Sequence, residues 1–374
     1  MRDRYNILLM IGIVLLIGTL FFSCVDDDDT PPVNSVVLVY MGGDNNLSDE
    51  TYQKIESLKQ GWNKNIKGKL LVYCDPSDAA PQLIEICTCK KGNPITEVVR
   101  TYDEENSASA EVFSRVISEV KSLYNAPSYG LILFSHASGW LPEGTLKSPK
   151  SILTDNEDTM SLGELASALP DHCFDYIIFE ACFMAGIEVA YELKDKANYI
   201  LASSAEIVSP GFTEIYKDAI NQLFQSPANI EGFARSAFKY YDAQNGYMRS
   251  ATFSIIKTGG LENLSSWIKE NCNLNKNVDL KTIQHFDRYT THRLFFDFED
   301  YYSTLLNDAE KEQELSTLIN TYVTYKAATS DFMIDYDGFV IKKHSGLTTY
   351  IRQERFPFLN EEYQKLEWHK DITD

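Results

Sequence analysis

A cysteine and a histidine occupy positions from which they could carry out acyl transfer. Cys182 follows the apolar run YIIF at 176–179 and precedes an amphipathic segment, so we expect its thiol at the start of a helix. The positive end of a helix dipole favours the thiolate form. His136 follows the run LILF at 131–134 and could move the proton. With backbone N–H groups for an oxyanion, this is the minimum set for hydrolysis through a thioester.

The elements that would position these two residues alternate between strand and helix. Short apolar runs bounded by turn residues are typical of parallel strands buried on both faces; they are VVLVYM (36–41), LLVY (70–73), LILF (131–134), YIIF (176–179) and YILAS (199–203). Amphipathic segments predict helices at 47–60, 109–123, 161–169 and 183–194, and Ser161 with Glu164 makes a capping box. We therefore expect an α/β fold, a mostly parallel sheet flanked by helices on both faces, with ligands beyond the carboxyl ends of the strands.

The chain divides into four predicted regions. Residues 1–23 resemble a signal peptide, 24–34 form an acidic linker and 35–220 hold the catalytic core. Residues 221–374 mix helical patterns with apparent strands such as ATFSII (251–256) and GFVI (338–341). We expect this last part to complete the sheet and to add a smaller C-terminal helical subdomain.

The N-terminal segment predicts export. The apolar run at 7–22 is shorter than the about 20 residues that a transmembrane helix needs, and its basic flank is typical of a secretory signal, although a short membrane anchor is the alternative. Ser23 before Cys24 resembles the lipobox of bacterial lipoproteins, in which Cys24 would carry lipid. The acidic string Asp26 to Asp29 resembles a surface-export signal. We therefore expect a lipoprotein of the outer membrane or cell surface of a Gram-negative bacterium.

Composition narrows the possible partners. With 34 Lys and Arg against 54 Asp and Glu, the net charge of −20 argues against nucleic acid. An apolar content of 44% is typical of a globular protein, and we expect a monomer. Seven cysteines are too few for a disulfide scaffold. Cys87 and Cys89 lie in a strand-like run and lack zinc-ligand spacing, so packing or a local redox bond is expected.

Six linked motifs occur in an order that resembles one family; they are VVLVYMGGDNNLS, SHASGW, FDYIIFEACFMAGIEVAYEL, ILASSAEI, FDFEDYY and HSGLTTYI. Taken alone, Cys182 or His136 would more often be a packed core residue, but together the motifs resemble clostripain-like cysteine peptidases of the caspase-like clan. The resemblance implies a catalytic His136, a nucleophilic Cys182, and an oxyanion hole from the N–H groups of Ala137 and Cys182. Family members usually carry Gly after the His, so Ala137 fits only with a negative φ or little turn strain.

The resemblance also implies substrates with Arg or Lys before the cleaved bond. Clostripain-like enzymes typically have Asp two residues before the Cys, and this chain has Glu180 there. Its carboxylate could still meet Arg through a two-pronged pair or Lys through one charged contact. The alternative is a structural carboxylate at the strand end. Glu206, in the following motif, is a possible second acid for substrate binding.

The loop at 141–150 predicts self-activation of a zymogen. Its polar sequence LPEGTLKSPK is typical of an exposed, easily cut loop. Related peptidases mature by cutting themselves after a basic residue in this region, which makes Lys147 and Lys150 the candidate sites. The rival function is a surface lipoprotein that is weakly active or inactive and uses the peptidase scaffold to bind peptide or glycan.

No cofactor is expected. The remaining histidines show no metal spacing; they are His172, His285, His292, His344 and His369. An acidic cluster could hold calcium, which some relatives use, but it lacks the ligand alternation of an EF-hand; it comprises Asp155, Asn156, Glu157 and Asp158.

Overall fold

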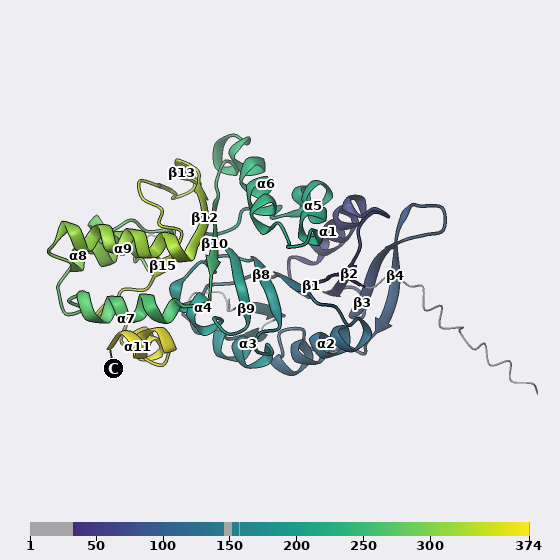
Figure 1. Ribbon diagram of the computed structural model, residues 1–374, viewed down its shortest axis with the longest axis horizontal. Coiled ribbons are helices and arrows are strands. Elements are labelled where there is room, and N and C mark those ends of the chain that lie inside the picture. The colour runs from purple at the N-terminus through teal and green to yellow at the C-terminus, as the bar shows by residue number, and fades with distance from the viewer. Residues whose placement is uncertain (1–32, 146–151, 157, 290, 374) are drawn as a thin grey trace, which may run out of the picture. The chain divides into compact units, whose positions relative to one another are not determined.

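A nine-stranded sheet forms the centre of the computed structural model, which describes residues 33–145, 152–156, 158–289 and 291–373 (Figure 1). The strand order is β12-β10-β9-β8-β5-β1-β2-β3-β4. The strands are β1 (Val36–Gly43), β2 (Lys69–Pro76), β3 (Gln82–Thr88), β4 (Pro94–Thr101), β5 (Tyr129–Phe134), β8 (Phe174–Glu180), β9 (Ala197–Ser203), β10 (Thr252–Lys257) and β12 (Val323–Ala328). The described residues from Val33 onward form one compact unit.

The five predicted strands are confirmed and lie together in the middle of the sheet. β2, β1, β5, β8 and β9 are consecutive neighbours, and every pair among them is parallel. All eight residues of β1 are buried, as a strand covered on both faces requires. Antiparallel strands complete both ends, with β10 and β12 beside β9 and with β3 and β4 beside β2.

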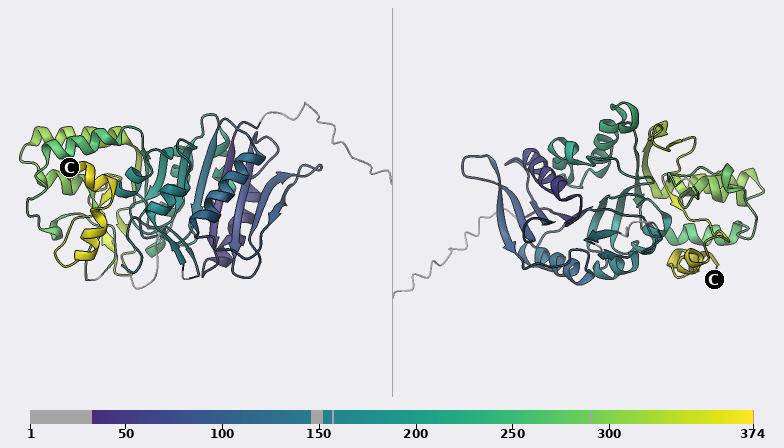
Figure 2. Two further views of the ribbon diagram at one scale, coloured as in Figure 1. Left: turned by 90° about the horizontal axis from the view of Figure 1, so that it is seen from below. Right: turned by 180° about the vertical axis from the view of Figure 1, so that it is seen from behind.

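Helices cover both faces of this sheet (Figures 1 and 2). One layer holds α1 (Ser48–Gly61), α5 (Thr213–Ala219) and α6 (Ile230–Asp242), and the other holds α2 (Ala110–Leu123), α3 (Leu162–Ala168) and α4 (Ile187–Glu192). α3 begins at the predicted capping box, in which Ser161 and Glu164 bond to each other's backbone N–H. The predicted α/β class is therefore confirmed.

Further helices gather at the β12 end of the sheet (Figures 1 and 2). They are α7 (Leu261–Asn271), α8 (Phe298–Leu305), α9 (Ala309–Tyr322), α10 (Pro357–Tyr363) and α11 (Glu367–Thr373). Trp368 of α11 is fully buried. The predicted run ATFSII forms β10, whereas GFVI contributes only β14 (Phe339–Val340), which pairs with β13 (Asp331–Phe332) outside the main sheet.

The remaining elements are short. Two pairs of short strands lie outside the main sheet. One pair is β11 (Phe296–Asp297) with β15 (Thr348–Thr349), and the other is β6 (Leu153–Asp155) with β7 (Asp158–Met160). Single 3-10 turns occur at Ile220–Phe224, Gly246–Met248 and Leu280–Thr282. In the described part of the chain, every helix is too short or too polar to cross a bilayer.

Candidate active site

Four polar side chains follow four neighbouring parallel strands at one edge of the sheet. They are Glu206 after β9, Cys182 after β8, His136 after β5 and Asn46 after β1. The carboxyl ends of parallel strands meet at the same edge, where ligands bind in sheets of this type. Phe134 of β5 pairs with Glu180 of β8. His136 and Cys182 therefore each lie two residues beyond paired positions on strands about 4.8 Å apart.

The backbone after β8 turns sharply instead of entering a helix. α4 begins at Ile187, five residues after Cys182. Phe183 has a φ of +63°, and its N–H donates to the carbonyl of Ala205 at 3.0 Å. The predicted helix over 183–194 is therefore wrong at its start, because this N–H bonds to the segment that follows β9. A helix dipole acts within its first turn, so it does not account for activation of the thiol.

A backbone donor reaches the Cys182 sulfur instead. The N–H of Ile207 donates to Sγ at 3.4 Å. A hydrogen bond to the charged form favours that form, so this donor stabilises a thiolate. Beside this donor, the hydrogen bond and the charge of Glu206 raise the pKa of Arg288, so its guanidinium stays charged.

Asn46 fixes the orientation of the His136 ring. Nε2 of His136 lies 2.7 Å from Oδ1 of Asn46, two residues before α1 begins. Because an amide oxygen only accepts hydrogen bonds, Nε2 carries the ring proton. Nδ1 is then the ring nitrogen that can take a proton from a thiol. Asn46 therefore acts as a positioning residue for the histidine.

Gly139 allows the loop of His136 to touch the loop of Cys182. Its φ is +62°, in the left-handed region that favours glycine. A Cβ at this position would lie 2.7 Å from the carbonyl oxygen of Phe183 and 3.0 Å from the Phe295 ring. Phe183 directly follows Cys182, so the close backbone approach brings the loop of His136 and the loop of Cys182 together.

Ala137 offers a backbone N–H beside His136. The residue is 2% exposed, and its N–H makes no hydrogen bond with any residue of the described ranges. A buried N–H of this kind can serve an oxyanion. Ala137 is not among the residues with a positive φ. The alanine therefore fits this turn without the left-handed backbone that would require glycine.

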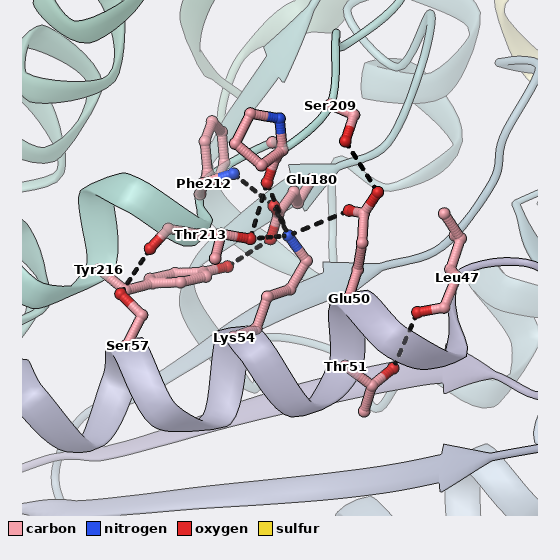
Figure 3. Close-up of polar contacts among 12 residues, drawn as sticks. Leu47, Glu50, Thr51, Lys54, Ser57, Glu180, Ser209, Phe212, Thr213 and Tyr216 are labelled. Carbon is pink, nitrogen blue, oxygen red and sulfur yellow. Dashed lines mark hydrogen bonds and ion pairs between the residues drawn. The ribbon is translucent and has the colours of Figure 1, made fainter. Parts of the chain in front are cut away.

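Glu180 is buried and fully engaged (Figure 3). The side chains of Lys54 and Glu180 are 0% and 1% exposed, and Nζ lies 2.6 Å from Oε1. The same Oε1 accepts from the Phe212 N–H, and Oε2 accepts from the Tyr216 hydroxyl at 2.5 Å. The carboxylate thus has its own cation and two further donors. The expectation that Glu180 receives the substrate's Arg or Lys stays a prediction, and this buried pairing favours the structural alternative.

Lys54 completes this buried cluster from helix α1. Its Nζ also donates to Oγ1 of Thr213 at 2.8 Å and to the Pro210 carbonyl at 3.1 Å. With Glu180, these acceptors satisfy all three ammonium protons. Nζ also lies 4.2 Å from the centre of the Phe134 ring. α1, the end of β8 and the segment entering α5 are therefore joined at a point two residues before Cys182 in sequence.

Glu206 is paired as well, but near the surface. Its Oε2 lies 2.5 Å from Nε of Arg288, and its Oε1 lies 3.1 Å from Nη2. The two side chains are 31% and 24% exposed, respectively. Of the two predicted acids, Glu206 is therefore the one that a ligand can reach.

Comparison with known proteins gives the family. The clostripain family model matches residues 39–356. The chain belongs to the clostripain family. Clostripain of Hathewaya histolytica is 26% identical over 209 residues, which cover 47% of this chain and 40% of clostripain. The match therefore spans less than half the length of that curated relative.

Two solved structures of clostripain-family proteases share the fold. One is an inactive zymogen of a C11 protease from Parabacteroides distasonis, 32% identical with a TM-score of 0.81, covering 92% of this chain and 99% of that chain. The other is a secreted C11 cysteine protease from Bacteroides thetaiotaomicron in complex with an irreversible peptide inhibitor, 25% identical with a TM-score of 0.80, covering 91% and 98%. The predicted family is confirmed.

Some predicted residues lie outside the described part of this clostripain-family chain; they are Cys24, Lys147, Lys150 and Glu157. Beside Glu157, a carboxylate oxygen of Asp155 accepts from the Ser107 N–H at 2.5 Å. Asp158 accepts from Asn106 at 2.8 Å. Within the described ranges, no group of three or more His, Cys, Asp or Glu side chains is placed to hold a metal ion.

A large hollow among the described residues lies away from these strand ends. It has a volume of about 1030 Å³, and Cys272 and His369 are among its lining residues. Burial raises the pKa of the Cys272 thiol to about 12, which disfavours the reactive thiolate. The presence of a thiol and an imidazole in one hollow therefore does not by itself indicate a catalytic site.

Three residues of this site were missed from the sequence. Asn46 lies in the polar segment after β1, where the strand-end rule could have indicated it. Lys54 lies three residues after Thr51 on the buried face of α1, and both are fully buried, so a lysine at helical spacing on that face was the available signal. Arg288 lies in an irregular segment, and no local pattern predicts its contact with Glu206.

We expect the Lys54–Glu180 pair to be essential for stability. Removing one partner of a buried pair leaves an uncompensated charge and costs about 3–5 kcal/mol. Lys54→Met should lower the free energy of unfolding by about that amount, and Lys54→Met/Glu180→Gln should lose less than the sum of the single variants. Urea denaturation in a Cys182→Ala background measures these values. The matched control is Lys217→Met, which removes an exposed pair and should cost at most about 1 kcal/mol; equal losses would contradict the assignment.

We also expect Asn46 to orient His136. Asn46→Ala should lower kcat about 10- to 100-fold with a smaller change in KM, because a misplaced ring loses its proton-transfer geometry. Asn46→Asp should recover part of the rate. It should also move the lower limb of the pH–rate profile to higher pH, because a carboxylate beside the ring favours imidazolium. Asn63→Ala, at an exposed turn, is the control. A wild-type rate in Asn46→Ala would exclude the positioning role.

Proposed function

We propose that this chain is an exported cysteine endopeptidase that cleaves after Arg or Lys through Cys182 and His136. The observation that carries the proposal is the register of β5 and β8, which sets the two residues at equivalent positions on adjacent strand ends. Family membership supports the same chemistry. The relative from Bacteroides thetaiotaomicron, with its irreversible peptide inhibitor, supports a peptide as the ligand.

In the proposed mechanism, His136 first accepts the proton of the Cys182 thiol at Nδ1. The sulfur then attacks the carbonyl carbon of the scissile peptide bond, and the carbonyl oxygen becomes an oxyanion. The N–H groups of Ala137 and Cys182 donate to that oxygen. His136 returns its proton to the leaving amine, which gives a thioester. Water, deprotonated by His136, hydrolyses the thioester and restores the thiol.

Asn46 and the buried cluster supply the rigidity that these steps need. Asn46 holds Nε2, so that the same ring nitrogen serves in both proton transfers. The Lys54–Glu180 pair fixes the backbone two residues before the sulfur. Small displacements of reacting groups lower rates strongly, so both contacts support the chemistry without touching substrate.

In this proposal, Glu206 selects the basic side chain of the substrate. Its carboxylate is about one-third exposed and is one residue from Ile207, whose N–H bonds to the Cys182 sulfur. A carboxylate beside the nucleophile can meet a guanidinium with two hydrogen bonds or an ammonium with one. Glu206 thereby takes the role that the sequence had assigned first to Glu180.

The central test removes the two catalytic side chains. Cys182→Ala should abolish turnover of short Arg and Lys reporter peptides, and His136→Ala should lower kcat/KM by at least about 10²-fold. Cys89→Ala, a partly exposed thiol that follows β3, is the matched control and should retain full activity. Thermal melts check that each variant is folded. Substantial turnover by Cys182→Ala would contradict the proposal and indicate a different catalytic site.

We propose, from the sequence, that the chain is a zymogen that cuts itself after Lys147, with Lys150 as a second site. The support is a polar loop close in sequence to His136, and the zymogen relative from Parabacteroides distasonis is consistent with such control. Incubated wild type should acquire a new N-terminus at Ser148 or Ser151, detected by N-terminal sequencing, while Cys182→Ala stays intact. An uncut wild type with full activity would rule out self-activation.

We likewise propose export and lipid attachment at Cys24, on sequence grounds alone. The full chain expressed in a Gram-negative host should partition into detergent and carry a mass increment at its mature N-terminus. Cys24→Ser should lose both properties. A wild-type protein with an unmodified Cys24 would contradict the anchor without affecting the catalytic assignment.

A further inference from the structure

The carboxylate of Glu206 is already paired with an arginine of the same chain, Arg288. Nε and Nη2 of Arg288 lie 2.5 and 3.1 Å from the two carboxylate oxygens, and Nη1 donates to the Tyr336 carbonyl at 2.6 Å. This two-pronged geometry is the one that a substrate arginine would need at the same carboxylate. The acid proposed to select the substrate is therefore already neutralised.

The segment that carries Arg288 packs against the Cys182 loop. The rings of Phe183 and Phe295 stack with their centroids 4.3 Å apart. The Phe286 N–H donates to the Phe295 carbonyl at 2.9 Å, which joins the two ends of the segment. Arg288 therefore reaches Glu206 from a part of the chain 82 residues away in sequence, beside the loop that carries Cys182.

The side chain of Asp287 links the two ends of this segment, which begins near Phe286 and ends near Phe295. This side chain is fully buried, and Oδ2 accepts from the N–H groups of Leu294 and Phe295 at 2.8 and 3.1 Å. The backbone next to Arg288 is thus fixed, whereas the Arg288 side chain is one-quarter exposed and bonded only at its head group. A competing cation could move the side chain without unfolding the segment.

We propose that Arg288 is a specificity-determining residue that competes with the substrate's basic side chain for Glu206. This inference rests on the proposed function. It adds that Arg288 limits how strongly the enzyme prefers basic substrates over neutral ones. A substrate arginine or lysine binds by displacing the Arg288 head group, so part of its contact with Glu206 replaces a contact that the free enzyme already makes. The side chains of Arg288 and Glu206 are 24% and 31% exposed, so water screens their attraction, and a substrate cation that makes the same contacts can displace the Arg288 head group.

The competition predicts the direction of each substitution. Arg288→Ala frees Glu206 and should raise the ratio of kcat/KM for an Arg reporter to that for a matched neutral reporter by about three- to tenfold. Arg288→Lys keeps a cation but loses the two-pronged pair, and should raise this ratio less. Glu206→Gln should bring the ratio close to one, and adding Arg288→Ala to it should change nothing further.

The experiment measures both reporters on the same enzyme preparations. A ratio cancels any effect of Arg288 on the reactivity of the Cys182 thiolate, which alters both reporters equally. Arg100→Ala is the matched control, because it removes a partly exposed arginine–glutamate pair at β4, the opposite end of the sheet. An unchanged or lower ratio in Arg288→Ala overturns the inference.

A binding measurement separates this result from catalysis. Benzamidine carries a planar cation similar to a guanidinium, and its binding can be followed by thermal shift in the Cys182→Ala background. Cys182→Ala/Arg288→Ala should bind it about three- to tenfold more tightly than Cys182→Ala alone, and equal affinity contradicts the competition. If Cys182→Ala itself turns over substrate, the proposed function fails; if only the Arg288 effects are missing, this inference fails alone.

Discussion

A buried lysine–glutamate pair joins helix α1 to the end of β8, two residues before Cys182. Lys54 reaches from α1 through the protein interior to Glu180, the last residue of β8, and satisfies its remaining protons on the segment that enters α5. Burying two charges is favourable only when geometry and hydrogen bonding are nearly complete, and here both partners have that environment. The strand end, the sharp turn at Phe183 and the helix layer above the sheet are therefore held in one arrangement.

This pair also involves the acidic residue two positions before the cysteine, Glu180, and so keeps that carboxylate in the protein interior. A carboxylate two residues before the cysteine has the expected charge, but its charge is balanced inside the protein. The accessible acid is Glu206 on the next strand end, and it too has an internal partner, Arg288. Both acids near Cys182 in sequence or through hydrogen bonds are therefore paired with cations of the same chain, one pair buried and one partly exposed.

The sequence predicted the parallel centre of the sheet because buried strands repeat apolar residues without interruption, and the linked motifs indicated the family. It also indicated Cys182 and His136, because both follow such strands. It did not predict the partners of Glu180 and Glu206, since Lys54 and Arg288 lie 126 and 82 residues away from them and long-range pairing leaves no local pattern. The helix expected at Cys182 failed for a related reason: backbone bonds to the segment after β9 replace the first helical turn.

Covalent labelling tests most directly whether Cys182 is the nucleophile. The protein should be treated with a peptide chloromethyl ketone that ends in arginine, digested, and analysed by mass spectrometry. The account predicts a single adduct on Cys182, formed much more slowly in His136→Ala. The other described thiols should stay unmodified; they are Cys74, Cys87, Cys89, Cys173 and Cys272. An adduct on any of these with Cys182 unmodified, or labelling at the same rate in His136→Ala, would contradict the assignment.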